Sequence, residues 1–521
     1  MPDSTNAPTL GEQPRGGARH MPQAAKSVWR ISIALILVLA SVGAWTATRS
    51  DSSVPLVSPT LLQLEPGHPG VTFGPGAVGL STEAFELSSD HFSARHDRLV
   101  RLMKLLGPSV LRIGGNSVDL SWWTSTGEPP PPWASSTVTP ADLSALSGLM
   151  QATRWKVLLG VDLGHFEPTR AADEARYAKA ILGNHLLGIE IGNEPDDFGR
   201  KPKLRAATYT IAQYVQEAEA YGRALSSTGV TLFGPALGRT EWLGQLGPTA
   251  QMFSELTLHY YPTSTCIGVE AAAAAQPATA DAELLSPGVR EQEEETLTAL
   301  MRAGLADSRP VRIGETNTAP CASSPSSNPV FASALWAMDW TLRAAARGVV
   351  GVSFHGNFSE CGSDSESPIC APSERAARAG NVVARPELYG LLAARQLEGG
   401  RFVPAHLLGL SPLRGVSAWA TVDSSGTIRV ALDNFATGGP AQPVSIPSAG
   451  YVVTTMALTA PSVASLTGVT FGNAAVTAGG RWQPRPRKPV LVGRSTRVLI
   501  PPASALVVIM RPTRPGHHTR Q

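Results

Sequence analysis

The sequence predicts an α/β fold, a (β/α)8 barrel of the TIM-barrel kind with a C-terminal β-sandwich domain. Two observations carry this prediction. Over residues 71–395, short apolar runs with the character of buried strands alternate with helical segments, and there are eight such runs. Eight strands alternating with helices favour a closed barrel over an open sheet. Beyond residue 396, strand-like runs follow one another without helices between them, which is typical of a β-sandwich.

Length and composition agree with two domains. A chain of 521 residues is too long for one small core, and its 43% hydrophobic content allows a large one. The net charge is +2, and no basic stripe interrupts the folded region, which argues against a nucleic-acid partner. Composition leaves the oligomeric state open.

Residues 1–50 are expected to be a signal peptide or signal anchor with a polar N-terminal region. Four basic residues precede the apolar run 31–45, a pattern typical of secretory targeting. The run is short for a spanning helix, which needs about 20 residues. We expect export, with the protein secreted, periplasmic or anchored to the membrane through residues 31–47. In each case the catalytic part lies outside.

Residues 51–70 are expected to be a linker or a strand that joins the sandwich. In the barrel, Arg205–Leu225 and Val330–Arg347 repeat apolar residues at helical spacing. A doubly wound sheet would carry a glycine-rich phosphate loop after its first strand, but Gly74-Pro75-Gly76 precedes that strand and reads as a turn. The eight predicted barrel strands are Val78–Ser81, Val110–Ile113, Lys156–Val161, Leu187–Gly192, Thr231–Gly234, Glu255–Tyr260, Val311–Gly314 and Val349–Phe354.

The predicted sandwich spans residues 396–511. Two of its strands flank Asp423–Gly426, which has the composition of a hairpin turn. The tail 512–521 is expected to be disordered. The predicted sandwich strands are Val416–Val422, Thr427–Leu432, Tyr451–Leu458, Thr496–Ile500 and Ala505–Met510.

Two predicted barrel strands, the fourth and the seventh, end in a carboxylate, Glu194 and Glu315. The carboxyl ends of barrel strands form the face on which such folds do chemistry. Glycoside hydrolysis needs two carboxyl groups, one as acid and one as nucleophile or base. The pair therefore predicts a glycosidase, although two ordinary strand-end glutamates remain an alternative. Glu190, inside the fourth strand, is expected to be a buried, paired structural residue.

Five short motifs resemble glycoside hydrolase family 79, the β-glucuronidase and heparanase group among the clan A retaining glycosidases. The resemblance covers roughly residues 71–510 and implies a retaining exo-β-glycosidase, most closely a β-glucuronidase. It makes Glu194 the general acid/base and Glu315 the nucleophile, with carboxyl groups about 5–5.5 Å apart. The motifs are Leu111–Ser117 with Trp122-Trp123, Gly160–Gly164, Gly192–Pro195, His259–Tyr261 and Gly314–Asn317.

The resemblance also implies substrate contacts. Asn193 would contact the 2-hydroxyl of the sugar, Tyr260 would touch the nucleophile, and Glu83 would bind sugar hydroxyls. Asn116, in the first motif, is a further candidate for substrate binding, and Arg112 is expected to pair with buried carboxylates beneath the site.

Groups near the nucleophile should keep it ionised. Arg312 and Asn317 flank Glu315 in the sequence, and we expect them to hydrogen-bond its charged form and lower its pKa. The three histidines His165, His259 and His355 lie near the same face, and each is interpreted as a satisfied polar residue.

The chain departs from the family pattern where substrate choice is decided. Relatives place a Gly-Gly pair after the nucleophile to hold the uronate carboxylate, and this chain has Thr318–Ser324 there. Relatives also bring a tyrosine from the loop after strand eight, which residues 357–370 lack. Two alternatives therefore remain: a retaining β-glycosidase for neutral sugars, and a non-catalytic glycan-binding envelope protein. The presence of both catalytic glutamates disfavours the second.

Four cysteines, an even number, suit an oxidising compartment. We expect Cys361 to pair with Cys370 and Cys266 with Cys321, and two other connectivities remain open. The spacings match no zinc motif, so neither a metal site nor a cofactor is expected. The expected partner is a carbohydrate substrate.

Overall fold

The computed structural model describes residues 59–200, 204–262, 283–319, 330–359, 361, 367–410, 415–489, 491–492 and 494–513. Val57–Gln521 form one compact unit. None of the helices in these described ranges is long and apolar enough to cross a membrane. The apolar run 31–47 and most of the tail lie outside the described ranges, so the expected targeting segment and the disordered tail stay predictions.

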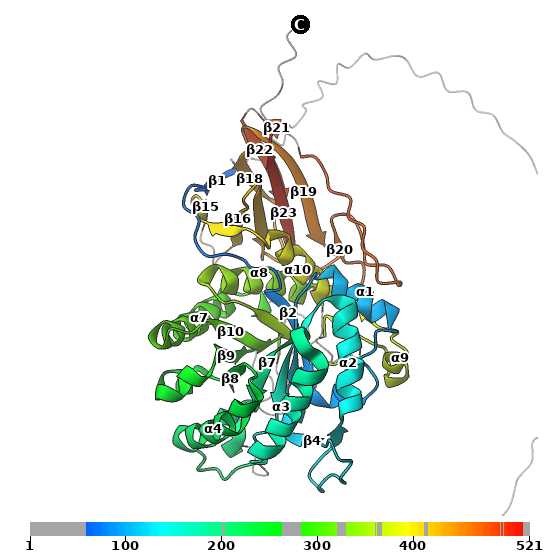
Figure 1. Ribbon diagram of the computed structural model, residues 1–521. Coiled ribbons are helices and arrows are strands. Elements are labelled where there is room, and N and C mark those ends of the chain that lie inside the picture. Colours follow the sequence, from blue (N-terminus) through cyan, green and yellow to red (C-terminus); the bar gives the residue numbers. More distant parts are fainter. Residues whose placement is uncertain are drawn as a thin grey trace, which may run out of the picture. The chain divides into compact units, whose positions relative to one another are not determined.

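Eight parallel strands close into a barrel, and each overlaps one of the eight predicted segments (Figure 1). The last strand pairs with the first, Val352 beside Val78, which completes the closure. The (β/α)8 prediction is confirmed. The barrel strands are β2 (Val78–Glu83), β3 (Val110–Gly114), β6 (Lys156–Val161), β7 (Leu186–Ile191), β8 (Leu232–Leu237), β9 (Glu255–Tyr260), β10 (Val311–Thr316) and β11 (Val352–His355).

Helices surround the barrel and begin at clear sequence signals. Thr139 and Thr210 each form a capping box at the start of a helix, which satisfies backbone donors that have no partner within the helix. The helices are α1 (Asp97–Leu105), α2 (Pro140–Thr153), α3 (Pro168–Leu182), α4 (Ile211–Leu225), α7 (Pro287–Asp307), α8 (Phe331–Arg347), α9 (Glu374–Arg378) and α10 (Pro386–Ala394).

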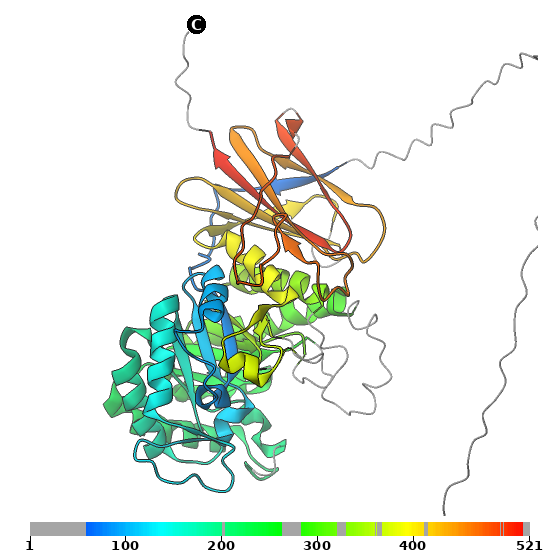
Figure 2. The ribbon, with the colours of Figure 1, turned by 90° about the vertical axis from the view of Figure 1, so that its right-hand side faces the viewer.

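Two further sheets pack beside the barrel helices α8 and α10 and form the sandwich (Figure 2). The first has the order β15-β1-β18-β22-β21 and the second β14-β16-β17-β23-β19-β20. Their strands are β1 (Thr60–Leu64), β14 (Arg401–Val403), β15 (Ala405–Leu407), β16 (Val416–Val422), β17 (Ile428–Asn434), β18 (Gln442–Pro447), β19 (Tyr451–Thr459), β20 (Thr470–Phe471), β21 (Leu491–Val492), β22 (Ser495–Ile500) and β23 (Ser504–Pro512).

The segment before the barrel supplies the strand β1. It pairs antiparallel with β15 and parallel with β18, so it lies inside the first sheet. Two small strand pairs complete the described structure: β4 (Ser121–Trp123) with β5 (Ser136–Val138), and β12 (Ile369–Cys370) with β13 (Val383–Ala384).

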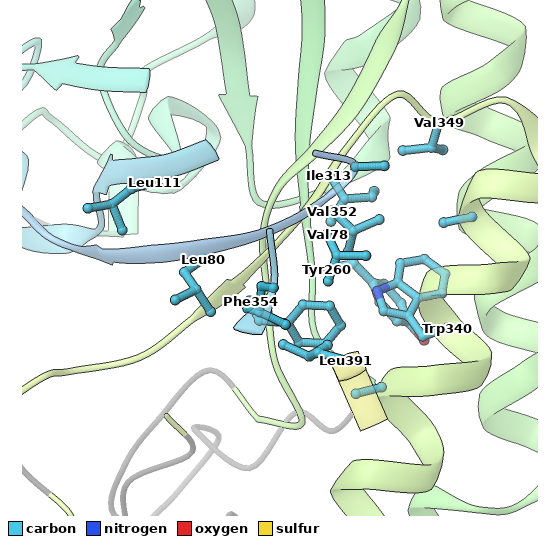
Figure 3. Packing of buried hydrophobic residues seen from close by; sticks show 14 of the residues in the cluster. Val78, Leu80, Leu111, Tyr260, Ile313, Trp340, Val349, Val352, Phe354 and Leu391 are labelled. Atoms are coloured by element: carbon cyan, nitrogen blue, oxygen red, sulfur yellow. The ribbon is translucent and has the colours of Figure 1, made fainter. Parts of the chain in front are cut away.

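One apolar core joins the barrel strands to the helices around them. Figure 3 shows this packing, with strand residues such as Ile313 and Phe354 beside Trp340 of α8 and Leu391 of α10. Helix α8 is buried at every position from Phe331 to Ala345, since it lies between the barrel and the sandwich. The core therefore holds the carboxyl ends of the strands on a rigid frame.

The loop after β11 carries a disulfide between Cys361 and Cys370, whose Cα atoms are 5.2 Å apart. This is the first of the two expected pairs. Cys266 and Cys321 lie outside the described residues, so their pairing stays a prediction.

Candidate active site

Glu194 and Glu315 stand at the carboxyl ends of β7 and β10. Glu194 follows β7 by three residues and has a φ of 49°, a conformation that costs energy for a non-glycine residue. Its backbone N–H donates to the carbonyl of Ala236, 2.8 Å away, which holds this turn. Glu315 lies within β10 and is only 6% exposed. Strands β8 and β9 separate β7 from β10 in the barrel, so the two carboxylates face each other across its mouth.

A histidine at the end of β9 lies between the two carboxylates. His259 Nδ1 is 3.0 Å from Glu194 Oε1 and 4.0 Å from Glu315 Oε1. One oxygen of each carboxylate and this nitrogen all lie within 4.8 Å of one another, an arrangement that could also hold a metal ion. The nearest oxygens of the two carboxylates are therefore closer together than the distance of about 6.5–9.5 Å that separates the carboxyl groups of an inverting site.

Arg112 of β3 lies beneath the pair and is fully buried. Its Nε donates to Glu190 Oε2 and its Nη1 to Glu315 Oε2, both at 2.5 Å. Its Nη2 donates to Asn193 Oδ1 at 3.0 Å. Arg112 thus occupies the position expected from the sequence, between buried carboxylates. Glu190 is buried and paired, as expected of a structural residue.

The two glycines after Arg112 leave room for charged side chains. A Cβ on Gly114 would lie 2.7 Å from the guanidinium carbon of Arg112. A Cβ on Gly115, which has a φ of 68°, would lie 2.5 Å from the carboxyl carbon of Glu83. A side chain at either position would displace a charged group of the site, which explains the glycine pair in the Leu111–Ser117 motif.

The surroundings of Glu315 favour its ionised form. Burial alone would raise the pKa of its carboxyl. The charges of His355 and His259, followed by Arg112, outweigh burial and hold the pKa of Glu315 well below its usual range. Tyr261 Oη also donates to Glu315 Oε1 at 2.7 Å. A carboxylate that stays ionised in a buried site can act as a nucleophile.

The predicted contact between Tyr260 and the nucleophile is wrong. The ring centroids of Tyr260 and Trp340 of α8 are 4.7 Å apart. Figure 3 shows the two side chains next to each other. The buried Tyr260 hydroxyl has no hydrogen-bond partner among the described residues. Successive side chains of a strand point to opposite faces, so Tyr261, one residue later, points to the barrel interior and contacts Glu315 instead.

The predicted support from Arg312 is also wrong. Arg312 is the second residue of β10, and its Nε donates to Glu255 Oε2 at 2.7 Å. Glu255 is the first residue of β9. This ion pair therefore lies near the amino ends of the strands, whereas Glu315 is close to the carboxyl end.

Glu83, at the end of β2, completes a polar wall with His355 at the end of β11. Glu83 Oε2 accepts from the Ser117 N–H at 2.8 Å. His355 Nε2 is 3.6 Å from Glu83 Oε1, and its Nδ1 is 3.5 Å from Glu315 Oε2. Burial would raise the pKa of Glu83, but the hydrogen bonds and charge of His355 hold it below its usual value.

His355 is part of the site, whereas the sequence predicts only a polar residue with its hydrogen bonds satisfied. Burial lowers the pKa of its imidazole, but the charge of Glu315 and the contact with Glu83 raise it overall. The protonated ring would bridge the two carboxylates. Its place at the end of the eighth strand is the signal that could have identified it.

The three asparagines occupy different positions. Asn193 is buried against Arg112, one residue before Glu194. Asn116 is exposed and is the first residue of the short helix η2 (Asn116–Leu120). It directly precedes Ser117, whose N–H donates to Glu83. Asn317 Nδ2 donates to the His355 carbonyl at 2.6 Å and to Glu387 Oε2 at 3.2 Å, so its side-chain amide joins the end of β11 to α10.

Neither a protein-family model nor a curated protein matches this chain. Several solved structures, by contrast, are similar to it in fold. A 4-O-α-L-rhamnosyl-β-D-glucuronidase from Fusarium oxysporum 12S is 20% identical with a TM-score of 0.67, covering 86% of this chain and 99% of the other. An α-L-arabinofuranosidase from Thermotoga maritima is 12% identical with a TM-score of 0.63, covering 87% and 100%.

A third structure is CelM2, a bifunctional glucanase-xylanase from a metagenome library. It is 13% identical with a TM-score of 0.56, covering 87% of this chain and 99% of the other. At these identities the similarity establishes the fold over nearly the whole length of the other chains. The resemblance to family 79 therefore stays a prediction.

Proposed function

We propose that this protein is a retaining β-glycosidase that works by double displacement. The observation that carries the proposal is the pair Glu194 and Glu315, whose nearest oxygens lie within 4.8 Å of each other at the mouth of the barrel. Their environments differ: Glu315 is buried against Arg112 and Tyr261, whereas the Glu194 side chain is 20% exposed. This asymmetry suits one nucleophile and one proton-transferring group.

In the first step Glu315 attacks the anomeric carbon of the sugar. The bond from that carbon to the leaving-group oxygen breaks as Glu194 donates its proton to that oxygen. In the second step Glu194 takes a proton from water, the water oxygen attacks the anomeric carbon, and the bond to Glu315 breaks. Arg112 and Tyr261 each hold one oxygen of Glu315, which orients it for attack.

The first substrate proposed is a β-glucuronide. The motifs that resemble family 79 support it, as does the fold similarity to the rhamnosyl-glucuronidase. A neutral sugar is the second candidate, favoured by one observation. Glu83, with its lowered pKa, adds an ionised carboxylate beside Glu315. These carboxylates can accept hydrogen bonds from sugar hydroxyls, whereas the nearby cations His355 and Arg112 already pair with them rather than with a uronate.

A panel of 4-nitrophenyl β-glycosides tests the activity and separates the two substrates. We expect cleavage with retention at the anomeric carbon, and the preferred member identifies the sugar. A 2-deoxy-2-fluoro glycosyl donor of that sugar should then label Glu315 covalently. A label on another carboxylate would overturn the role assignment. Glycan binding without any hydrolysis would favour the non-catalytic alternative.

We also propose that the folded unit works outside the cytoplasm. The basic residues followed by the apolar run 31–45 support export, and so does the disulfide at Cys361–Cys370. Peptide mapping of the natively expressed protein without reduction should recover this pair as one disulfide-linked peptide. Finding only free thiols there would contradict the proposal.

A further inference from the structure

A hollow lies on the same face of the barrel as Glu194 and Glu315. Its volume is about 540 Å³, within the range of about 300–1,000 Å³ typical of small-molecule sites. Its walls are residues 125–128, which follow β4, and residues 166–173, which open α3. These segments follow the carboxyl ends of β3 and β6, so they share the face that carries Glu194 (Figure 1). We call this hollow the α3 groove.

The lining of the α3 groove suits a sugar. Phe166 is 49% exposed, although large apolar side chains are usually buried, and the rest of the lining is mostly polar. Hydroxyls and carboxylates come from Ser125, Thr126, Glu128 and Asp173. An exposed ring can pack against the C–H face of a pyranose, while these groups accept hydrogen bonds from its hydroxyls.

Hydrogen bonds hold the groove in shape. Thr124 Oγ1 accepts from the N–H groups of Gly127 at 3.0 Å and Glu128 at 3.2 Å, which shapes one wall. Arg170 Nη1 donates to Glu128 Oε1 at 2.5 Å, and its Nε to Glu167 Oε2 at 2.5 Å, which ties the two walls together. A site shaped before binding loses less conformational entropy when the ligand arrives.

Packed aromatic side chains lie beside the α3 groove. The Arg170 guanidinium lies 3.4 Å above the Trp122 ring. Trp122 packs edge-on against Trp133, which stacks on His165 at 3.6 Å. Trp122 lies two residues after η2, the short helix that donates to Glu83 through the Ser117 N–H. The buried Trp122 therefore links the groove, through the chain, to the segment that holds Glu83.

The position of the groove indicates which part of a substrate it would meet. Strand β6, which leads into one wall of the groove, is one of the two barrel neighbours of β7, whose end carries Glu194. In the proposed reaction Glu194 protonates the leaving-group oxygen, so the leaving group lies on the β7 side. We propose, on the basis of the proposed function, that the α3 groove binds a sugar residue of the leaving group. The natural substrate is then an oligosaccharide or a glycoconjugate rather than a simple glycoside.

The test compares Phe166→Ala with Leu305→Ala, which removes an apolar side chain that is 83% exposed on α7. Each variant is assayed on the 4-nitrophenyl glycoside preferred by the wild type and on a tetrasaccharide that ends in the same β-linked sugar. We expect Phe166→Ala to lower kcat/KM for the tetrasaccharide about fivefold, as loss of one ring contact would. The aryl glycoside should be unaffected, and Leu305→Ala should change neither value.

An equal loss on both substrates, or no loss on the tetrasaccharide, would overturn the proposal. Calorimetric titration of the tetrasaccharide decides the question without turnover, by comparing Glu315→Gln with the double variant Glu315→Gln/Phe166→Ala. Weaker binding by the double variant supports the groove even if the wild type cleaves no aryl glycoside, in which case only the proposed function fails. Equal binding, or no binding by either, rules the groove out.

Discussion

Two buried arginines, Arg112 at the barrel mouth and Arg343 beneath the sandwich, have similar partners and different roles. Arg343 of α8 donates to Asp339 Oδ2 at 2.6 Å and to Glu294 Oε1 at 2.9 Å, and it lies 3.1 Å from Glu293 Oε2. Like Arg112 it is almost fully buried among carboxylates. A buried arginine with several acids therefore does not by itself identify an active site.

The difference lies in what the carboxylates face. Asp339 uses its second oxygen to accept from Trp419 Nε1 of the sandwich at 2.7 Å, so this cluster joins the barrel to the sandwich. Glu315 instead faces Glu194, whose side chain is 20% exposed at the mouth. The acids also differ in protonation. Burial raises the pKa of Glu293 to about 8 despite the charge of Arg343. The pKa of Glu315 is instead held low, so that its carboxyl stays ionised. Arg343 also keeps one acid ionised, because its charge lowers the pKa of the buried Asp339. Access from the barrel mouth is therefore what distinguishes the Glu315 cluster.

The largest expected effect separates the two mouth carboxylates. Glu315→Gln should lose about 10⁴-fold or more in kcat, because no covalent intermediate can form. Glu194→Ala should still react with substrates that have good leaving groups, and azide should restore turnover by attacking the intermediate without a general base. The measurement is turnover of an activated aryl glycoside by each variant, with and without azide.

Azide rescue of Glu194→Ala should yield a β-linked glycosyl azide. If Glu315→Gln stayed active, or if Glu194→Ala kept full activity on poor leaving groups, the roles assigned here would be wrong. Glu83 or Glu190 would then become the candidates.

Removing each arginine tests whether the two clusters differ in role. Arg343→Met and Arg112→Met should each destabilise the fold by about 3–5 kcal/mol, since both leave buried acids without their partner. Urea unfolding measures this loss. At a temperature where both variants are folded, Arg343→Met should keep wild-type kcat, whereas Arg112→Met should lose most activity. Equal activity losses would contradict the proposed division.

The neighbouring tyrosines provide a matched pair. Tyr261→Phe removes a hydrogen bond to ionised Glu315 and should lower kcat/KM about tenfold. Because that bond helps to lower the pKa of Glu315, its loss raises the pKa, and the acidic limb of the pH profile should move to higher pH. Tyr260→Phe removes a hydroxyl with no described partner and should leave the profile unchanged. A shift in the Tyr260 variant would refute the assignment.

The smallest effect concerns Asp433 of β17, near the Arg343 cluster. Burial, and then the charge of Asp339, raise the pKa of Asp433 well above its usual value, although Arg290 opposes this. Folded Asp433 therefore keeps a proton that the unfolded chain releases above a pH of about 4. Stability should consequently fall as pH rises from there towards the folded pKa.

Asp433→Asn removes this titration. The variant should gain stability over the wild type progressively as pH rises above about 4, with activity unchanged. Thermal melts between pH 4.5 and 8 measure the difference. A constant difference across that range would show that Asp433 does not titrate on folding.

The barrel and the positions of Glu194 and Glu315 could be predicted from the sequence because both depend on local patterns. Each strand is a short apolar run, and each glutamate lies at the end of one or just beyond it. Contacts between residues far apart in the sequence were harder to predict. His355 contacts Ser81 and Glu83, which precede it by 274 and 272 positions in the chain, and no local pattern records that contact.

The sequence also predicted the direction of some side chains wrongly. The pairing register of β10 with its neighbours shifts between Ile313 and Glu315, an irregularity of the kind that re-aims a side chain. Strict alternation cannot anticipate such a shift. The contact with Glu315 could have been assigned correctly by alternation. His259 and Tyr261 are two residues apart, so their side chains point to the same face, whereas Tyr260 points to the other.

The position of β1 has a consequence for synthesis and for dissection of the chain. Thr60–Leu64 is translated before the barrel, yet its partners β15 and β18 emerge more than 300 residues later. During synthesis this strand must wait unpaired while the whole barrel forms. A fragment that begins at the barrel, or one cut out after residue 395, would lack a strand from the interior of its sheet. The sandwich is therefore the last part of the protein to close, and it can be built only from both ends of the folded unit.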